Sequence, residues 1–168
     1  MFKLGDVVVY GTDGICNIIE ETIREFDGRT IEYYVLSPLE KNADLIYVPK
    51  NNKKILSKMR HVISMDEANR LIADMPDEVM NWIENDRDRS QAFKNILLYG
   101  SILDLLSMTH LLYLKQIEQL EVGKKLHAQD ERFLRDAERM LFEELSYILK
   151  LSQSEVIKLL KIKKAAVL

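Results

Sequence analysis

The sequence predicts an α+β protein in which a small antiparallel β domain precedes an all-helical domain. From Leu4 to about Val48, short β-branched and aromatic runs alternate with turn residues, a pattern typical of a small antiparallel sheet or barrel. After about Ile63, apolar residues recur at helical spacing behind helix-start signals. We therefore expect two domains, spanning residues 1–62 and 63–168.

The strands of the first domain are bounded by residues that suit tight turns. Gly11 to Gly14 and the pair Asp27-Gly28 tolerate the positive φ angles of such turns, and Pro38 and Pro49 mark strand ends. The expected strands are Asp6–Tyr10, Ile15–Ile23, Thr30–Leu36 and Asp44–Val48, with a weak fifth strand near Lys54–Leu56.

The helices of the second domain begin at capping signals. Ser64 and Glu67 form the capping box of a first helix, which ends before Pro76. Asp77 can cap a second, short helix that carries Trp82. A third helix runs to about Tyr99, where Gly100 supplies a stop.

Three further helices complete the second domain. A fourth starts at Ser101 and ends near Gly123, and a fifth opens around His127 to Asp130. A final helix starts at Ser152 with Glu155. The expected core residues are Leu105, Met108, Leu112 and Ile117 in the fourth helix, and Phe133, Leu134, Ala137, Leu141 and Leu145 in the fifth.

Composition limits the classes of partner. The 24 Lys and Arg residues against 27 Asp and Glu give a net charge of −3, so any nucleic-acid contact must be local and strong autonomous DNA binding is not expected. The single cysteine, Cys16, excludes an intramolecular disulfide and suits a reducing compartment. With no secretory h-region and no apolar stretch of about 20 residues, we expect a soluble cytoplasmic protein without a membrane partner.

No catalytic or cofactor motif stands out. His61, His110 and His127 are scattered, without cysteines or paired carboxylates at metal-ligand spacing, so neither a metal nor another cofactor is expected. Gly11 to Gly14 precedes a strand rather than a helix and favours a turn over a phosphate loop. The sequence therefore indicates an interaction protein rather than an enzyme.

Trp82, the only tryptophan, has two interpretations. As a structural residue, it would pack between helices. As a functional residue, it would wedge into a distorted DNA minor groove while Arg87, Arg89 and Lys94 hold nearby phosphates, although the acidic residues between them dilute this patch.

A second basic cluster lies at the C-terminus, where an amphipathic segment leads into several lysines. It favours a solvated terminal helix, with a phosphate contact or a membrane-surface helix as the functional alternatives. The lysines are Lys158, Lys161, Lys163 and Lys164.

The first half of the chain combines four short motifs: Phe2 to Tyr10, Gly14-Ile15, Glu32 to Leu36 and Val48-Pro49. This combination resembles the start of the CarD/CdnL family of bacterial transcription regulators, a half that transcription-repair coupling factors share. In the second half, the segments that look like the CarD helical domain are Asn81-Trp82, the region of Arg87 and Arg89, Gly100, Asp130 to Leu134 with Ala137, and Glu144-Leu145.

This resemblance implies a first domain that is a Tudor-like β-barrel and binds the RNA polymerase β subunit, largely by pairing strand edges. It places the polymerase contact at Arg24 and along Asp44, Leu45, Ile46 and Tyr47. Many relatives carry an arginine where this chain has Tyr47, and Pro-His in the loop where it has Gly11-Thr12-Asp13. The tyrosine replaces a charge-assisted contact by an aromatic one.

The resemblance also implies that the second domain contacts promoter DNA at the upstream edge of the transcription bubble. Trp82 matches the family's wedge, and Arg87, Arg89 and Lys94 are its basic neighbours. The alternatives are a KOW-like adaptor that binds ribosomal RNA and a non-enzymatic interaction scaffold. We expect a monomer, and self-association through the barrel edge stays open.

Overall fold

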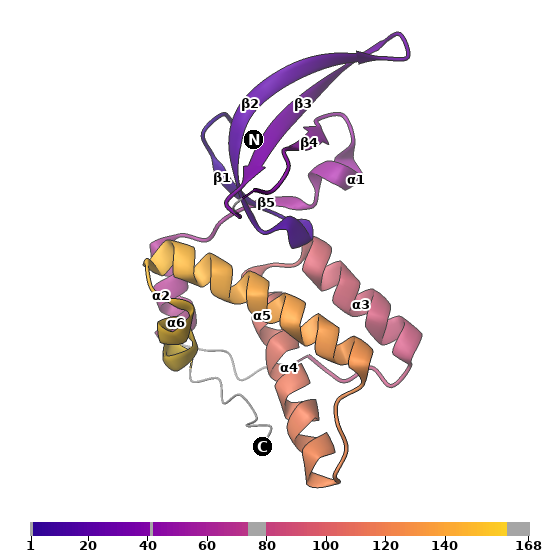
Figure 1. The fold of residues 1–168 in the computed structure, drawn as a ribbon, viewed down its shortest axis with the longest axis vertical. Helices are drawn as coiled ribbons and strands as arrows, with labels where there is room; N and C mark the ends of the chain where they lie inside the picture. The colour runs from indigo at the N-terminus through magenta and orange to yellow at the C-terminus, as the bar shows by residue number, and fades with distance from the viewer. Residues whose placement is uncertain (1, 41, 74–79, 161–168) are drawn as a thin grey trace. The chain divides into compact units, whose positions relative to one another are not determined.

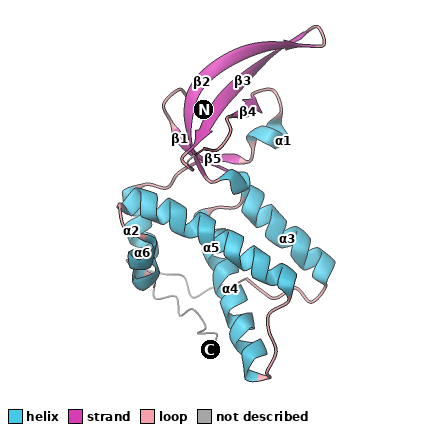
Figure 2. Cartoon of the chain, in the orientation of Figure 1, coloured by secondary structure: helices cyan, strands magenta, loops and turns pink. Residues whose placement is uncertain are grey.

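The chain divides into two compact units, Met1–Val62 and Ile63–Leu168. The computed structural model describes residues 2–40, 42–73 and 80–160. Within these residues, all strands belong to the first unit, and all α-helices but one short one belong to the second (Figures 1 and 2). The predicted α+β class, with a β domain before a helical domain, is confirmed.

The first unit is built on a five-stranded antiparallel sheet with the order β4-β3-β2-β1-β5. The β2–β3 hairpin is long and curved (Figure 1). It turns at Asp27 and Gly28, whose φ angles of 52° and 71° confirm the predicted positive-φ turn. The strands are β1 Val7–Tyr10, β2 Ile15–Phe26, β3 Arg29–Pro38, β4 Ile46–Pro49 and β5 Met59–His61.

One face of this sheet carries the core of the first unit. Cys16 is buried in it. The core cluster consists of Val8, Tyr10, Cys16, Ile18, Tyr34, Leu36, Val48 and Met59. Because side chains alternate along a strand, residues between these, such as Tyr33 and Tyr47, lie on the opposite face.

The weak strand predicted at Lys54–Leu56 is wrong. These residues belong to the short helix α1, Lys53–Leu56, and the fifth strand lies just beyond it at Met59–His61. The side chain of Asn52 accepts a hydrogen bond from the Ile55 amide at 3.1 Å, which caps the helical turn. Ile55 and Leu56 then pack together against the core, which an extended strand would not allow.

The described strand order runs from β4 at one end of the sheet to β5 at the other. These ladders establish an antiparallel sheet, and they do not include a pairing of β4 with β5 that would close a barrel. The barrel therefore stays an expectation from the family resemblance.

The second unit contains five helices within the described residues: α2 Met65–Ala73, α3 Asp86–Tyr99, α4 Ile102–Glu121, α5 Ala128–Leu149 and α6 Gln153–Leu159. The predicted starts at Ser64, Ser101 and Ser152 are confirmed, each with a reciprocal capping box. The predicted short helix is wrong at Met80–Ile83, which is not helical, while Pro76 and Asp77 lie outside the described residues.

Two clusters form the core of the second unit. One joins α3, α4 and α5, and the other joins α2, α4, α5 and α6. The predicted core residues of α5 are buried, as are Leu105, Met108 and Leu112 of α4. The prediction of a core position for Ile117 is wrong, since this residue is 38% exposed. The buried residues of α4 end at Tyr113, so Ile117 lies in the C-terminal part of the helix, beyond the part that the core covers.

Candidate functional site

Arg24 and Tyr47 meet on the sheet face opposite the core of the first unit. The Arg24 guanidinium carbon lies 3.9 Å from the centre of the Tyr47 ring. The Tyr33 ring stands edge-on to Tyr47, with 6.4 Å between the two ring centres. Strand pairing produces this cluster, because Val35 of β3 lies opposite Tyr47 and Ile31 lies opposite Arg24. We call Arg24, Tyr33 and Tyr47 the Arg24–Tyr47 face.

The structure divides the predicted polymerase-binding residues into three groups. Arg24 and Tyr47 share the exposed face. Ile46 pairs with Leu36 and packs against the core on the other side of the sheet. Asp44 and Leu45 are exposed and precede β4, the end strand of the sheet. An end strand has a side on which its main-chain groups can accept a further strand.

The predicted wedge, Trp82, is a half-buried side chain of the second unit. Its ring packs against the α3–α4–α5 core. The segment is held by the Met80 amide, which donates a 2.9 Å hydrogen bond to Ser107 Oγ on α4. The Arg89 guanidinium lies 4.3 Å from the centre of the Trp82 ring, and Lys115 Nζ lies 5.0 Å from it. The ring is therefore fixed between the core and two cations.

Arg89 is buried, whereas a phosphate contact would require it at the surface. Its side chain is only 6% exposed, and it forms a salt bridge with the similarly buried Asp130. Nε and Nη2 donate to the two carboxylate oxygens of Asp130 at 3.2 and 3.0 Å. Nη2 also donates to Asp86 at 2.6 Å, and Nη1 donates to the carbonyl oxygens of Ile83 and Glu84. These five hydrogen bonds match the five donors of a guanidinium.

The charge of Arg89 is balanced inside the unit. Burial by itself would lower the pKa of Arg89, but the hydrogen bonds and charges of Asp130 and Asp86 outweigh burial and raise it. Asp86, one of the acids expected to dilute the basic patch, is therefore paired with Arg89.

Arg87 and Lys94, the other predicted DNA contacts, are exposed on α3. They are seven positions apart, so they lie on one face of the helix. The helix begins with Asn85, whose side chain accepts hydrogen bonds from the Arg87 and Asp88 amides. Trp82 thus lies in the segment just before the capped N-terminus of α3, and Arg87 and Lys94 lie on the helix itself.

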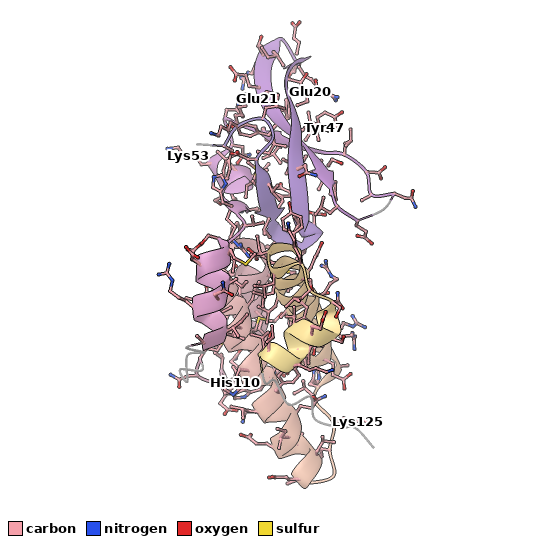
Figure 3. The ribbon with its side chains drawn as sticks, turned by 90° about the vertical axis from the view of Figure 1, so that its left-hand side faces the viewer. Glu20, Glu21, Tyr47, Lys53, His110 and Lys125 are labelled. Atoms are coloured by element: carbon pink, nitrogen blue, oxygen red, sulfur yellow. The ribbon has the colours of Figure 1, made fainter. Side chains whose placement is uncertain are left out.

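A cleft of about 270 Å³ opens beside Trp82. Lys115 of α4 and Lys125, which follows the C-terminal end of that helix (Figure 3), line it with Trp82 and Arg89. Neither lysine is among the site residues predicted from the sequence. Nothing in their local spacing points to Trp82, because only the packing of α4 against α3 and α5 brings them to it.

The described residues contain no group of three or more His, Cys, Asp or Glu side chains placed to hold a metal ion. Among the same residues, no helix is long and apolar enough to cross a membrane. Both candidate contact surfaces, the Arg24–Tyr47 face and the surroundings of Trp82, are built from aromatic and cationic side chains.

Residues 2–63 match the family model of the CarD-like/TRCF RID domain. The first unit is a CarD-like/TRCF RID domain. The match covers the whole sheet and ends where the helical unit begins. Comparison with curated proteins gave no match.

RID domains are non-catalytic interaction domains that bind the RNA polymerase β subunit. The RID domain therefore connects this chain with RNA polymerase and transcription. Both the Arg24–Tyr47 face and the end strand β4 lie within it.

Proposed function

We propose that the protein is a transcription regulator that binds the RNA polymerase β subunit through its first unit and contacts promoter DNA through its second. The contact with DNA lies near the edge of the transcription bubble and changes the stability of the open complex. The observation that carries this proposal is the Arg24–Tyr47 face, set beside an end strand in a RID domain.

The polymerase contact combines main-chain pairing with side-chain anchors. Asp44, Leu45, Ile46 and Tyr47 run into and along β4, where a strand of the partner can add to the sheet edge. Arg24 and Tyr47 belong to the residue types that dominate binding hot spots. Because Arg24 already stacks on Tyr47 in the free chain, less side-chain entropy is lost on binding.

The DNA contact uses Trp82 as an apolar wedge, with Arg87 and Lys94 on nearby phosphates. Arg89 is a positioning residue in this proposal, since its donors are already matched and its guanidinium lies against the Trp82 ring. Lys115 and Lys125 add positive charge beside the wedge.

Tethering to polymerase explains how a protein with a net negative charge could contact DNA. Docking of the first unit raises the effective concentration of the second at the promoter, so a weak DNA contact suffices. A wedge that binds open promoter DNA better than closed DNA shifts the equilibrium by its differential affinity alone. A difference of about 1.4 kcal/mol would shift it about tenfold.

The polymerase contact is tested by binding of the purified chain to the isolated β-subunit lobe. We expect saturable binding that Tyr47→Glu weakens at least tenfold, because the substitution puts a negative charge beside Arg24 and removes the ring on which it stacks. Tyr147→Glu is the matched control, since Tyr147 is about as exposed as Tyr47 but lies in the second unit.

No binding of the wild-type chain at tens of micromolar would contradict the proposal. Binding to ribosomal RNA in its place would favour the adaptor alternative. The DNA contact is tested separately, because Trp82→Ala should shorten the lifetime of open complexes while leaving affinity for the lobe unchanged.

A further inference from the structure

Charge is segregated within the first unit. The chain has no acidic residue between Asp44 and Asp66, and this stretch carries five basic ones: Lys50, Lys53, Lys54, Lys58 and Arg60. The β2–β3 hairpin has the opposite balance over residues 20–32, with Glu20, Glu21, Glu25, Asp27 and Glu32 against Arg24 and Arg29. An overall net charge of −3 therefore conceals a strongly basic segment.

Three lysines of this segment have no carboxylate partner in the part of the chain that the structure describes. Lys50 is satisfied within the sheet, where it pairs with Glu21 and Glu32 and lies 4.5 Å from the centre of the Tyr34 ring. Arg60 donates to the His61 carbonyl oxygen. We call the remaining three, Lys53, Lys54 and Lys58, the lysine patch; no salt bridge of the described residues involves them.

The fold exposes the two α1 lysines of this patch on the side of the sheet away from the Arg24–Tyr47 face, while Lys58 is half-buried. Ile55 and Leu56 attach α1 to the core side of the sheet, which leaves Lys53 and Lys54 exposed. Tyr47 lies on the other side of the sheet, and Figure 3 shows Lys53 and Tyr47 on opposite sides of the unit. A partner on the Arg24–Tyr47 face would therefore leave the lysine patch accessible.

We propose that the lysine patch binds the phosphate backbone of duplex DNA, so that the first unit makes a DNA contact of its own. Protein interfaces are depleted in lysine and enriched in arginine and aromatic residues, as the Arg24–Tyr47 face is. Lysines without interspersed acids suit a uniformly negative backbone, which they contact as point charges without reading sequence. This interaction goes beyond the proposed function, which places DNA binding in the second unit alone.

The test measures affinity of the full-length chain for a short labelled DNA duplex over a range of salt concentrations, starting at low salt. Lys53→Gln/Lys54→Gln removes two charges of the patch. Lys3→Gln/Arg29→Gln is the matched control, because it removes the same charge from exposed positions elsewhere in the first unit. Both pairs leave Trp82, Arg87 and Lys94 intact.

We expect the patch variant to bind the duplex more weakly than the wild type does. The slope of log affinity against log salt concentration should become less negative by about 1.8, because each phosphate that is no longer neutralised contributes about 0.9 to it. The control should keep the wild-type slope. Equal effects of the two pairs, an unchanged slope, or no saturable binding by the wild-type chain would overturn the proposal. So would a patch variant that binds the β-subunit lobe more weakly but binds DNA as the wild type does.

The same measurements separate this proposal from the proposed function. The lysine patch is assessed on free duplex without polymerase. The proposed function depends instead on lobe binding by Tyr47 and on the effect of Trp82 on open-complex lifetime.

Discussion

A guanidinium buried beneath a tryptophan must have each of its donors matched, because an unpaired buried charge costs several kcal/mol. Arg89 meets this requirement through Asp130, Asp86 and two carbonyl oxygens. The bond to Asp130 links α3 to α5 across 41 positions of sequence, so one ion pair fixes both the helix packing and the platform under Trp82.

Removing Asp130 should therefore unfold the second unit more easily. In Asp130→Ala, Arg89 keeps Asp86, which is largely exposed, and loses its buried counter-charge. We expect a loss of about 3 kcal/mol in the free energy of unfolding. Urea unfolding followed by the fluorescence of Trp82, the only tryptophan, measures it. Asp136→Ala, at an exposed position of the same helix, should cost well under about 1 kcal/mol, and equal losses would contradict this assignment.

At the scale of the elements, capping residues could be read from the sequence, while the α1 turn could not. Ser64, Ser101 and Ser152 cap their helices through local contacts three residues apart, so their spacing alone is informative. Residues 53–56 are too few to show a helical period. Their conformation depends on the Asn52 cap and on packing of Ile55 and Leu56 against the sheet.

The junction between α3 and α4 gives a prediction about a glycine. A Cβ on Gly100 would lie 2.5 Å from the carbonyl oxygen of Ile96, which is fixed within α3. Gly123, after α4, has open space around it but a φ of +69°. We expect Gly100→Ala to cost about 1–3 kcal/mol through steric overlap and Gly123→Ala to cost about 1 kcal/mol through backbone strain. Thermal unfolding compares them, and a Gly100→Ala protein as stable as wild type would show that the two helices can separate there without cost.

At the scale of the whole molecule, local sequence patterns offer candidate contact residues, but they do not show how long-range packing positions those residues. Arg24 and Tyr47 were expected to act together, and strand register brings them into contact across β3. Arg89 was expected among the surface cations. It is buried because Asp130 and Trp82, which lie in other segments, pack against it. No local sequence pattern predicts these long-range contacts. Long-range packing likewise places Lys115 beside Trp82.

In the proposed tether, the DNA contact of the second unit depends on polymerase binding by the first unit, and a double variant can test this dependence. If docking of the first unit supplies the effective concentration for the second, the two contacts act in sequence and their effects are not additive. Below the concentration at which Tyr47→Glu binds polymerase, adding Trp82→Ala should change open-complex lifetime no further. Once the protein concentration is raised until Tyr47→Glu saturates polymerase, Trp82→Ala should again shorten that lifetime.

Independent action of the units would give a different result. Trp82→Ala would then shorten open-complex lifetime by the same factor in the wild-type and Tyr47→Glu backgrounds at every concentration. Open-complex lifetimes for the wild type, both single variants and the double variant, measured at a low and a saturating concentration, distinguish the two schemes. A constant factor would mean that the second unit reaches DNA without the first, and the acidic net charge would then have to be overcome by the local cations around Trp82 alone.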